Sequence, residues 1–68
     1  MRTKKQWRNY AAQCKWTVKH LRKDFKEACA MLYNGDLSAG VLMADRANAI
    51  GLYSGRAQAY KEISESVE

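Results

Sequence analysis

The sequence predicts an all-α fold, namely a two-helix αα-hairpin that assembles as a homodimeric four-helix bundle. The 68-residue chain has no proline, and its first turn signal is Asn34-Gly35-Asp36. Upstream of this signal, large apolar residues recur at helical spacing, and downstream of it small residues recur about every four positions. We therefore expect one helical-hairpin domain over residues 1–68.

The first helix is expected over about residues 4–33, where no glycine interrupts the pattern. Its apolar residues alternate steps of four and three, and with Tyr10 and Cys29 they cover an arc of about 100° at 100° per residue. The stripe consists of Trp7, Ala11, Cys14, Val18, Leu21, Phe25, Ala28 and Leu32. A sustained repeat of this kind favours coiled-coil-like packing against another helix.

A tight turn is expected at residues 34–36. Asn-Gly is also a signal for a β-hairpin, but a β-hairpin needs flanking strands of period two, and the upstream period is helical. Gly35 can adopt the left-handed conformation that follows a helix, and Asp36 or Ser38 can cap the next helix. The second helix is then expected over about residues 37–65.

The second helix has a face of small residues. This face holds Gly40, Ala44, Ala47, Gly51, Ser54 and Gly55. Each glycine inside a helix costs about 1 kcal/mol relative to alanine, so the glycines indicate a place where two backbones approach closely. The predicted dimer interface is Ala44, Ala47, Gly51, Gly55 and Ala59. The alternative is that the helix breaks at Gly51 or Gly55, which would give a third short helix from about Ser54.

The bulky residues of the second helix do not share one stripe. Leu42, Ile50, Tyr53 and Tyr60 lie on one side, and Val41, Leu52 and Ile63 lie on another. A helix that is apolar nearly all round is surrounded by other elements, and a hairpin cannot surround its own helix. A second copy of the chain is therefore the expected neighbour, with the parallel or antiparallel sense of the dimer left open.

The composition supports assembly rather than catalysis. Only 14 residues are Leu, Ile, Val, Met or Phe, whereas 10 are Ala. A core of this size rarely provides more than roughly 3–5 kcal/mol of net stability. The length excludes two domains and makes an enzyme improbable. No CxxC, HExxH or GxxxxGK[ST] motif occurs, so we expect no catalytic residue, no metal, no cofactor and no small-molecule substrate.

The cysteine positions and the apolar segments indicate a cytoplasmic protein. Cys14 and Cys29 would lie ~22 Å apart on one helix, too far for a disulfide, and free thiols are typical of a reducing compartment. The most apolar stretch, residues 37–53, is shorter than the ~20 residues of a membrane span and contains Asp45 and Arg46. No apolar run of 7–15 residues follows the basic N-terminus, so a secretory signal is not expected.

Positive charge is concentrated on the first helix. Residues 1–33 contain nine Lys and Arg against two acidic residues, whereas residues 34–68 contain three against five. Six of the cations fall within an arc of about 60° beside the apolar stripe, and Asp24 and Glu27 lie elsewhere on the circumference. The six are Lys4, Arg8, Lys15, Lys19, Arg22 and Lys26. This stripe is either a solvated flank of the core or a surface for an acidic ligand.

Two further residues lie away from the apolar stripe. Trp16 is surrounded by polar and charged residues, and tryptophan is enriched in binding hot spots, so we expect Trp16 at an interface. Met31 is weaker evidence of the same kind. His20 is the only histidine, and its i,i+4 spacing to Asp24 predicts a surface pair rather than a catalytic one.

These observations predict a small non-enzymatic interaction or regulatory protein. It would form a homodimer and modulate an acidic protein partner through the basic, Trp-containing helix. The alternative is a nucleic-acid-binding protein that uses the same stripe on phosphates, with strong salt dependence and no base readout. A third reading places the first helix on an anionic membrane with Trp7 and Tyr10 inserted, which requires a free apolar stripe.

Overall fold

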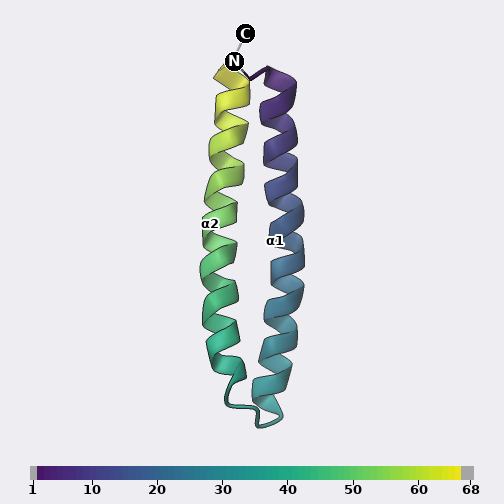
Figure 1. Ribbon diagram of the computed structural model, residues 1–68, viewed down its shortest axis with the longest axis vertical. Helices are drawn as coiled ribbons and strands as arrows, with labels where there is room; N and C mark the ends of the chain where they lie inside the picture. The colour runs from purple at the N-terminus through teal and green to yellow at the C-terminus, as the bar shows by residue number, and fades with distance from the viewer. Residues whose placement is uncertain (1, 67–68) are drawn as a thin grey trace.

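The computed structural model describes residues 2–66 and shows a hairpin of two antiparallel helices, α1 (Lys4–Tyr33) and α2 (Ala39–Ser66). The helices lie side by side along their whole length, and both ends of the described chain lie at the same end of the hairpin (Figure 1). The molecule is a rod of 53 × 15 × 14 Å. The all-α hairpin and the range of the first helix are therefore confirmed.

The N-terminus of α1 is closed by a capping box. The Thr3 hydroxyl accepts a hydrogen bond from the Gln6 amide (3.2 Å), and the Gln6 side chain accepts one from the Thr3 amide (2.8 Å). These bonds satisfy two backbone donors that the helix cannot satisfy by itself. The helix therefore starts at Lys4, directly after Thr3.

The C-terminus of α1 ends in a Schellman motif. The amide of Gly35 donates to the carbonyl of Leu32 and the amide of Asp36 donates to the carbonyl of Met31, both at 3.0 Å. Gly35 has a φ of +100°, a conformation that a residue with a Cβ adopts only with strain. Gly35 therefore acts as predicted, as the left-handed residue that terminates the helix.

The start of α2 differs from the expected residue 37. The Asp36 carboxylate accepts hydrogen bonds from the Ser38 amide (3.1 Å) and the Ser38 hydroxyl (2.6 Å), which holds residues 36–38 in a turn. The α-helix consequently begins at Ala39. It then continues through Gly51 and Gly55 without a break to Ser66, so the alternative with a third helix is wrong.

The apolar stripe of α1 packs against α2 as predicted. All eight stripe residues from Trp7 to Leu32 are buried or half-buried, and so are Tyr10 and Cys29. The most deeply buried of them are Ala11, Cys14, Val18 and Ala28. Because this stripe is covered by α2, it is not free to insert into a membrane.

The residues of α2 that pack against α1 form a line, the contact line of α2, that the hydrophobicity of the sequence did not reveal. It follows the same alternating steps of four and three as the stripe of α1. Its members, all buried or half-buried, are Ala39, Met43, Arg46, Ile50, Tyr53, Ala57, Tyr60 and Ser64. Half of them are small or polar, so bulky residues alone do not mark this line. Of the residues that the sequence placed on one side, Ile50, Tyr53 and Tyr60 belong to it, whereas Leu42 is exposed.

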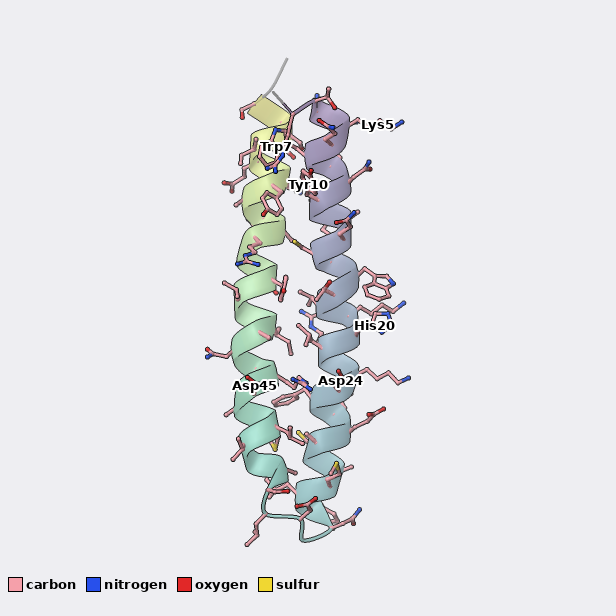
Figure 2. All side chains as sticks on the ribbon, viewed as in Figure 1. Lys5, Trp7, Tyr10, His20, Asp24 and Asp45 are labelled. Carbon is pink, nitrogen blue, oxygen red and sulfur yellow. The ribbon has the colours of Figure 1, made fainter. Side chains whose placement is uncertain are left out.

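Aromatic residues close the open end of the hairpin. The Trp7 ring lies 5.6 Å from the Tyr60 ring and 6.0 Å from the Tyr10 ring, measured between centroids. Tyr10 and Tyr60 are 5.9 Å apart, and the Arg2 guanidinium lies 4.9 Å from the centre of the Tyr10 ring. Figure 2 shows Trp7 and Tyr10 beside the end of α2. This cluster joins the start of α1 to the end of α2.

Candidate functional site

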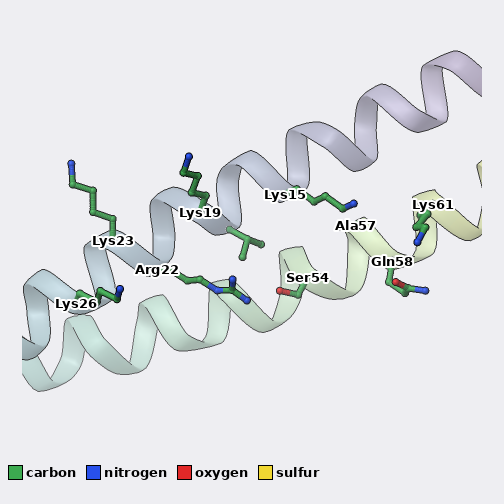
Figure 3. Close-up of a pocket in the computed structure, with 10 residues that line it drawn as sticks. Lys15, Lys19, Arg22, Lys23, Lys26, Ser54, Ala57, Gln58 and Lys61 are labelled. Carbon is green, nitrogen blue, oxygen red and sulfur yellow. The ribbon is translucent and has the colours of Figure 1, made fainter.

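A groove of about 590 Å³ runs between the helices on one long side of the hairpin. One wall is α1 and the other is the C-terminal half of α2 (Figure 3). The lining residues are Lys15, Val18, Lys19, Arg22, Lys23, Lys26, Ser54, Ala57, Gln58 and Lys61. The groove therefore gathers cations from both helices around neutral and apolar side chains.

No acidic side chain lines this groove. Within residues 2–66, both ion pairs belong to Arg46, which contacts Asp24 at 3.8 Å and Asp45 at 2.9 Å. Asp24 of α1 is thus paired with α2 and not with a cation of the groove. The six cations of the groove repel one another and attract anions.

The floor and the walls of the groove differ in chemistry. Val18 and Ala57 form an apolar floor and are only 8% and 6% exposed. Val18 belongs to the apolar stripe of α1, and Ala57 belongs to the contact line of α2. On the α1 wall, Lys15 and Arg22 extend toward α2, whereas Lys19 points away from it (Figure 3). The α2 wall has short or neutral side chains at Ser54 and Gln58. A ligand in the groove would meet positive charge chiefly from one side.

The structure brings four of the predicted basic residues together. Lys15, Lys19, Arg22 and Lys26 line the groove, whereas Lys4 and Arg8 are exposed in the first turns of α1 and do not line it. Sequence reasoning missed two cations of the groove, Lys23 and Lys61. Lys61 belongs to α2, and only the antiparallel register of the two contact lines places it on this side.

Trp16 lies outside the groove. The residue is 64% exposed, and its ring lies against the His20 ring, with centroids 3.9 Å apart and the planes tilted by 45°. On α1, Trp16 is followed by Lys19 three residues later and by Lys23 seven residues later, and both lysines line the groove. Trp16 therefore lies next to the edge of the groove. The expected pair of His20 and Asp24 does not form, because Asp24 instead contacts Arg46. Met31 is also exposed.

The residues of the predicted dimer interface face solvent. Ala44, Ala47, Gly51, Gly55 and Ala59 are all exposed on the sides of α2 that α1 does not cover. A Cβ built on Gly40, Gly51 or Gly55 would have no neighbouring atom within 4 Å. Packing within one hairpin therefore gives no reason for these glycines.

Two large apolar residues border the small residues on the outer side of α2. Val41 is 74% exposed and Leu52 is 54% exposed. At 100° per residue both lie within about 60° of Gly55 and Ala59 on the helix circumference. The outer side of α2 thus combines small and large apolar residues at the surface.

Comparison with known protein families, curated proteins and solved structures finds no match for this chain. Within residues 2–66, no three His, Cys, Asp or Glu side chains come together as a metal site. Neither described helix combines the length and hydrophobicity that a membrane crossing requires. Cys14 and Cys29 are free thiols.

Proposed function

We propose that this chain is a small non-enzymatic interaction protein that binds an acidic segment of a partner protein in the groove between α1 and α2. The observation that carries the proposal is the set of six cations around an apolar floor, with no acidic side chain in the lining. Like charges at i,i+4, such as Lys15 with Lys19 and Arg22 with Lys26, destabilise a helix by a few tenths of a kcal/mol per pair. A ligand that neutralises them offsets this cost.

The shape of the groove favours a protein over a nucleic acid. The hairpin is only 15 × 14 Å in cross-section, and the apolar floor at Val18 and Ala57 lies between the helices. Phosphates on the outside of a nucleic acid would contact the outward cations but have no apolar group to place on the floor, which would stay in contact with water. A protein side chain can neutralise the cations and cover the floor at the same time.

We further propose that two hairpins associate through the outer side of α2. The chain exposes 5291 Å², whereas a compact protein of 7.8 kDa exposes about 4,400 Å². The difference, about 900 Å², is similar to the ≈ 800 Å² that each partner buries in a standard interface. Gly55 and Ala59 would allow close approach, and Val41 and Leu52 would supply apolar contact area. Ala44, Ala47 and Gly51 of the predicted interface lie nearer the groove on the helix circumference. This arrangement leaves the groove of each copy open.

The proposed role is regulatory and the proposed location is the cytoplasm. Regulation fits because the groove can hold a ligand, while the absence of a catalytic motif in the sequence leaves binding as the available activity. The cytoplasm fits the two free thiols. While the groove holds the acidic segment of the partner protein, that segment would not be available for the partner's other contacts.

The test is affinity capture from a native lysate with and without nuclease, using the wild type and the variant Lys19→Glu/Arg22→Glu. We expect the wild type to retain a protein after nuclease treatment and the variant to lose it. If everything captured disappears with nuclease, the ligand is a nucleic acid and the proposed function is wrong.

Self-association is tested separately by sedimentation velocity. The wild type should sediment as a dimer at high micromolar concentration, and Gly55→Leu should shift it to monomer by steric clash. A monomeric wild type under these conditions would contradict the dimer and would leave the groove proposal intact.

A further inference from the structure

We infer that the partner segment in the groove is an acidic amphipathic α-helix, which lies along both helices and completes a three-helix bundle. This inference rests on the proposed function, because it specifies the conformation of the acidic protein segment that the groove binds. The spacing of the cations, the chemistry of the two walls and the hydrogen-bonding needs of the ligand all favour such a helix.

The cations of α1 repeat with the helical period. Lys15, Lys19, Arg22 and Lys26 follow steps of four, three and four, the same steps as the contact line of α1. At 1.5 Å per residue they span about 16 Å, or three turns. A helix packed alongside presents its carboxylates at the same repeat, so each acidic residue on one edge of that helix can meet a cation.

The hydrogen-bonding needs of the ligand backbone favour a helix over an extended chain. Both walls are helices whose backbone groups already bond within the helix, so they offer no sheet edge. Lysine and arginine donate hydrogen bonds and do not accept them. In the lining, only Ser54 and Gln58 have side chains that can accept a bond from a ligand amide. An α-helix satisfies its own backbone and needs no such acceptors.

The α2 wall allows a third helix to come close. Ser54 and Gln58 continue a line of small residues that runs toward the turn with the same steps of three and four. The line consists of Gly40, Ala44, Ala47, Gly51 and Ser54. No atom lies within 4 Å of a Cβ built at Gly40 or Gly51. Small residues permit interaxial distances near the lower end of the 8–10 Å range for packed helices.

The two walls specify two edges of the bound helix. The edge that faces α1 carries Glu or Asp, and the edge that faces α2 carries Ala, Gly or Ser, with one further acid near Lys61. Charge excludes the same face of a second copy as the occupant, because it would bring six more cations against the six already in the groove. The occupant is therefore a different chain of opposite charge.

The test uses the full chain and two stapled peptides of identical composition. The patterned peptide has Glu along one edge at steps of four and three and Ala along the adjacent edge. The scrambled peptide distributes the same Glu residues around the helix. Stapling keeps both helical, because free helices shorter than ∼12–15 residues are marginal in water. A DNA duplex serves as the third probe, and affinities are measured by calorimetry.

We expect the patterned peptide to bind at least tenfold more tightly than the scrambled peptide. Ser54→Leu on the α2 wall should weaken the patterned peptide at least fivefold by steric clash. The matched variant Gln13→Leu, exposed on the other side of α1, should not change its affinity. Circular dichroism of both variants establishes that each hairpin is folded.

Equal affinity for the two peptides, or an unchanged affinity in Ser54→Leu, would overturn the three-helix arrangement and leave the proposed function standing. Binding of the duplex in preference to both peptides would overturn the proposed function as well. No binding of either peptide would also contradict both. The comparison of the two peptides and the Ser54→Leu variant therefore test the conformation of the ligand, whereas the duplex and the absence of peptide binding test its chemical class.

Discussion

The two long sides of the hairpin differ in what their positively charged side chains contact. On the side away from the groove, Arg46 contacts Asp24 and Asp45, and the Arg56 guanidinium lies 5.3 Å from the centre of the Tyr53 ring. On the groove side, six cations share a lining that contains no acid. The first side uses its cations within the fold, whereas the second leaves them for a ligand. Substitutions can therefore separate binding from stability.

The largest expected effect is on binding. Lys19→Glu/Arg22→Glu should weaken affinity for the patterned acidic peptide at least about 100-fold, since each lost charge-assisted hydrogen bond contributes ≈ 1.5–3 kcal/mol. Thermal stability should stay the same or rise slightly, because the repulsive i,i+4 pairs of Lys19 and Arg22 are removed. Calorimetry and thermal denaturation measure the two quantities. The control Lys5→Glu/Arg56→Glu changes the net charge equally outside the groove and should keep most of the affinity.

The next effect concerns stability and distinguishes the two tryptophans. Trp7→Ala should lower the free energy of unfolding by about 2 kcal/mol, below the 3–5 kcal/mol of a fully buried tryptophan because Trp7 is half-buried. Trp16→Ala should change it by less than about 0.5 kcal/mol, since the residue is 64% exposed. Urea denaturation measures both. A larger loss for Trp16→Ala than for Trp7→Ala would contradict the packing of the open end.

Two glycines should respond to alanine in opposite directions. Gly35→Ala should destabilise the hairpin by roughly 1–2 kcal/mol, because its φ of +100° strains a residue with a Cβ. Gly51→Ala should stabilise it by up to about 1 kcal/mol, because the added methyl meets no atom within 4 Å and helix propensity improves. Thermal denaturation at low protein concentration reports on the single hairpin. Destabilisation by Gly51→Ala under those conditions would show that the glycine packs within the hairpin.

The smallest effect is expected on the side that pairs its charges. Asp24→Asn removes one contact of Arg46, and both groups are partly exposed, so the loss should be below about 1 kcal/mol. The loss should shrink further in 1 M salt, where the Debye length is about 3 Å. Urea denaturation at low and high salt measures it, and a loss that salt does not change would argue against a screened ion pair.

The sequence predicted α1 and the turn because their signals are local. Steps of four and three marked the stripe of α1, and Asn34-Gly35 marked the turn. The contact line of α2 was missed because Ala39, Arg46 and Ser64 carry no hydrophobic signal, although their spacing repeats that of α1. The helix α2 starts at Ala39 and not at residue 37, because the Asp36 side chain bonds to Ser38 and holds a turn there. Helix propensities of single residues do not include such a bond.

The groove could be predicted only in part. Its α1 wall follows from the period of one helix, since Lys15, Lys19, Arg22 and Lys26 share one side of it. Lys61 required knowledge of the register between the helices. The position of Trp16 outside the groove could not be predicted without the direction of the second helix. That direction determines which side of α1 becomes a wall of the groove and which side stays on the outside.

The central claim is that the groove side binds acidic protein and the opposite side does not. The most direct measurement is a titration of the isotope-labelled full chain with the patterned acidic peptide, followed by NMR chemical-shift changes at each amide. We expect changes concentrated at residues 15–26 and 54–61, with little change at Asp24 and Arg46. Changes centred on Arg46 and Arg56, or spread evenly over both helices, would contradict it.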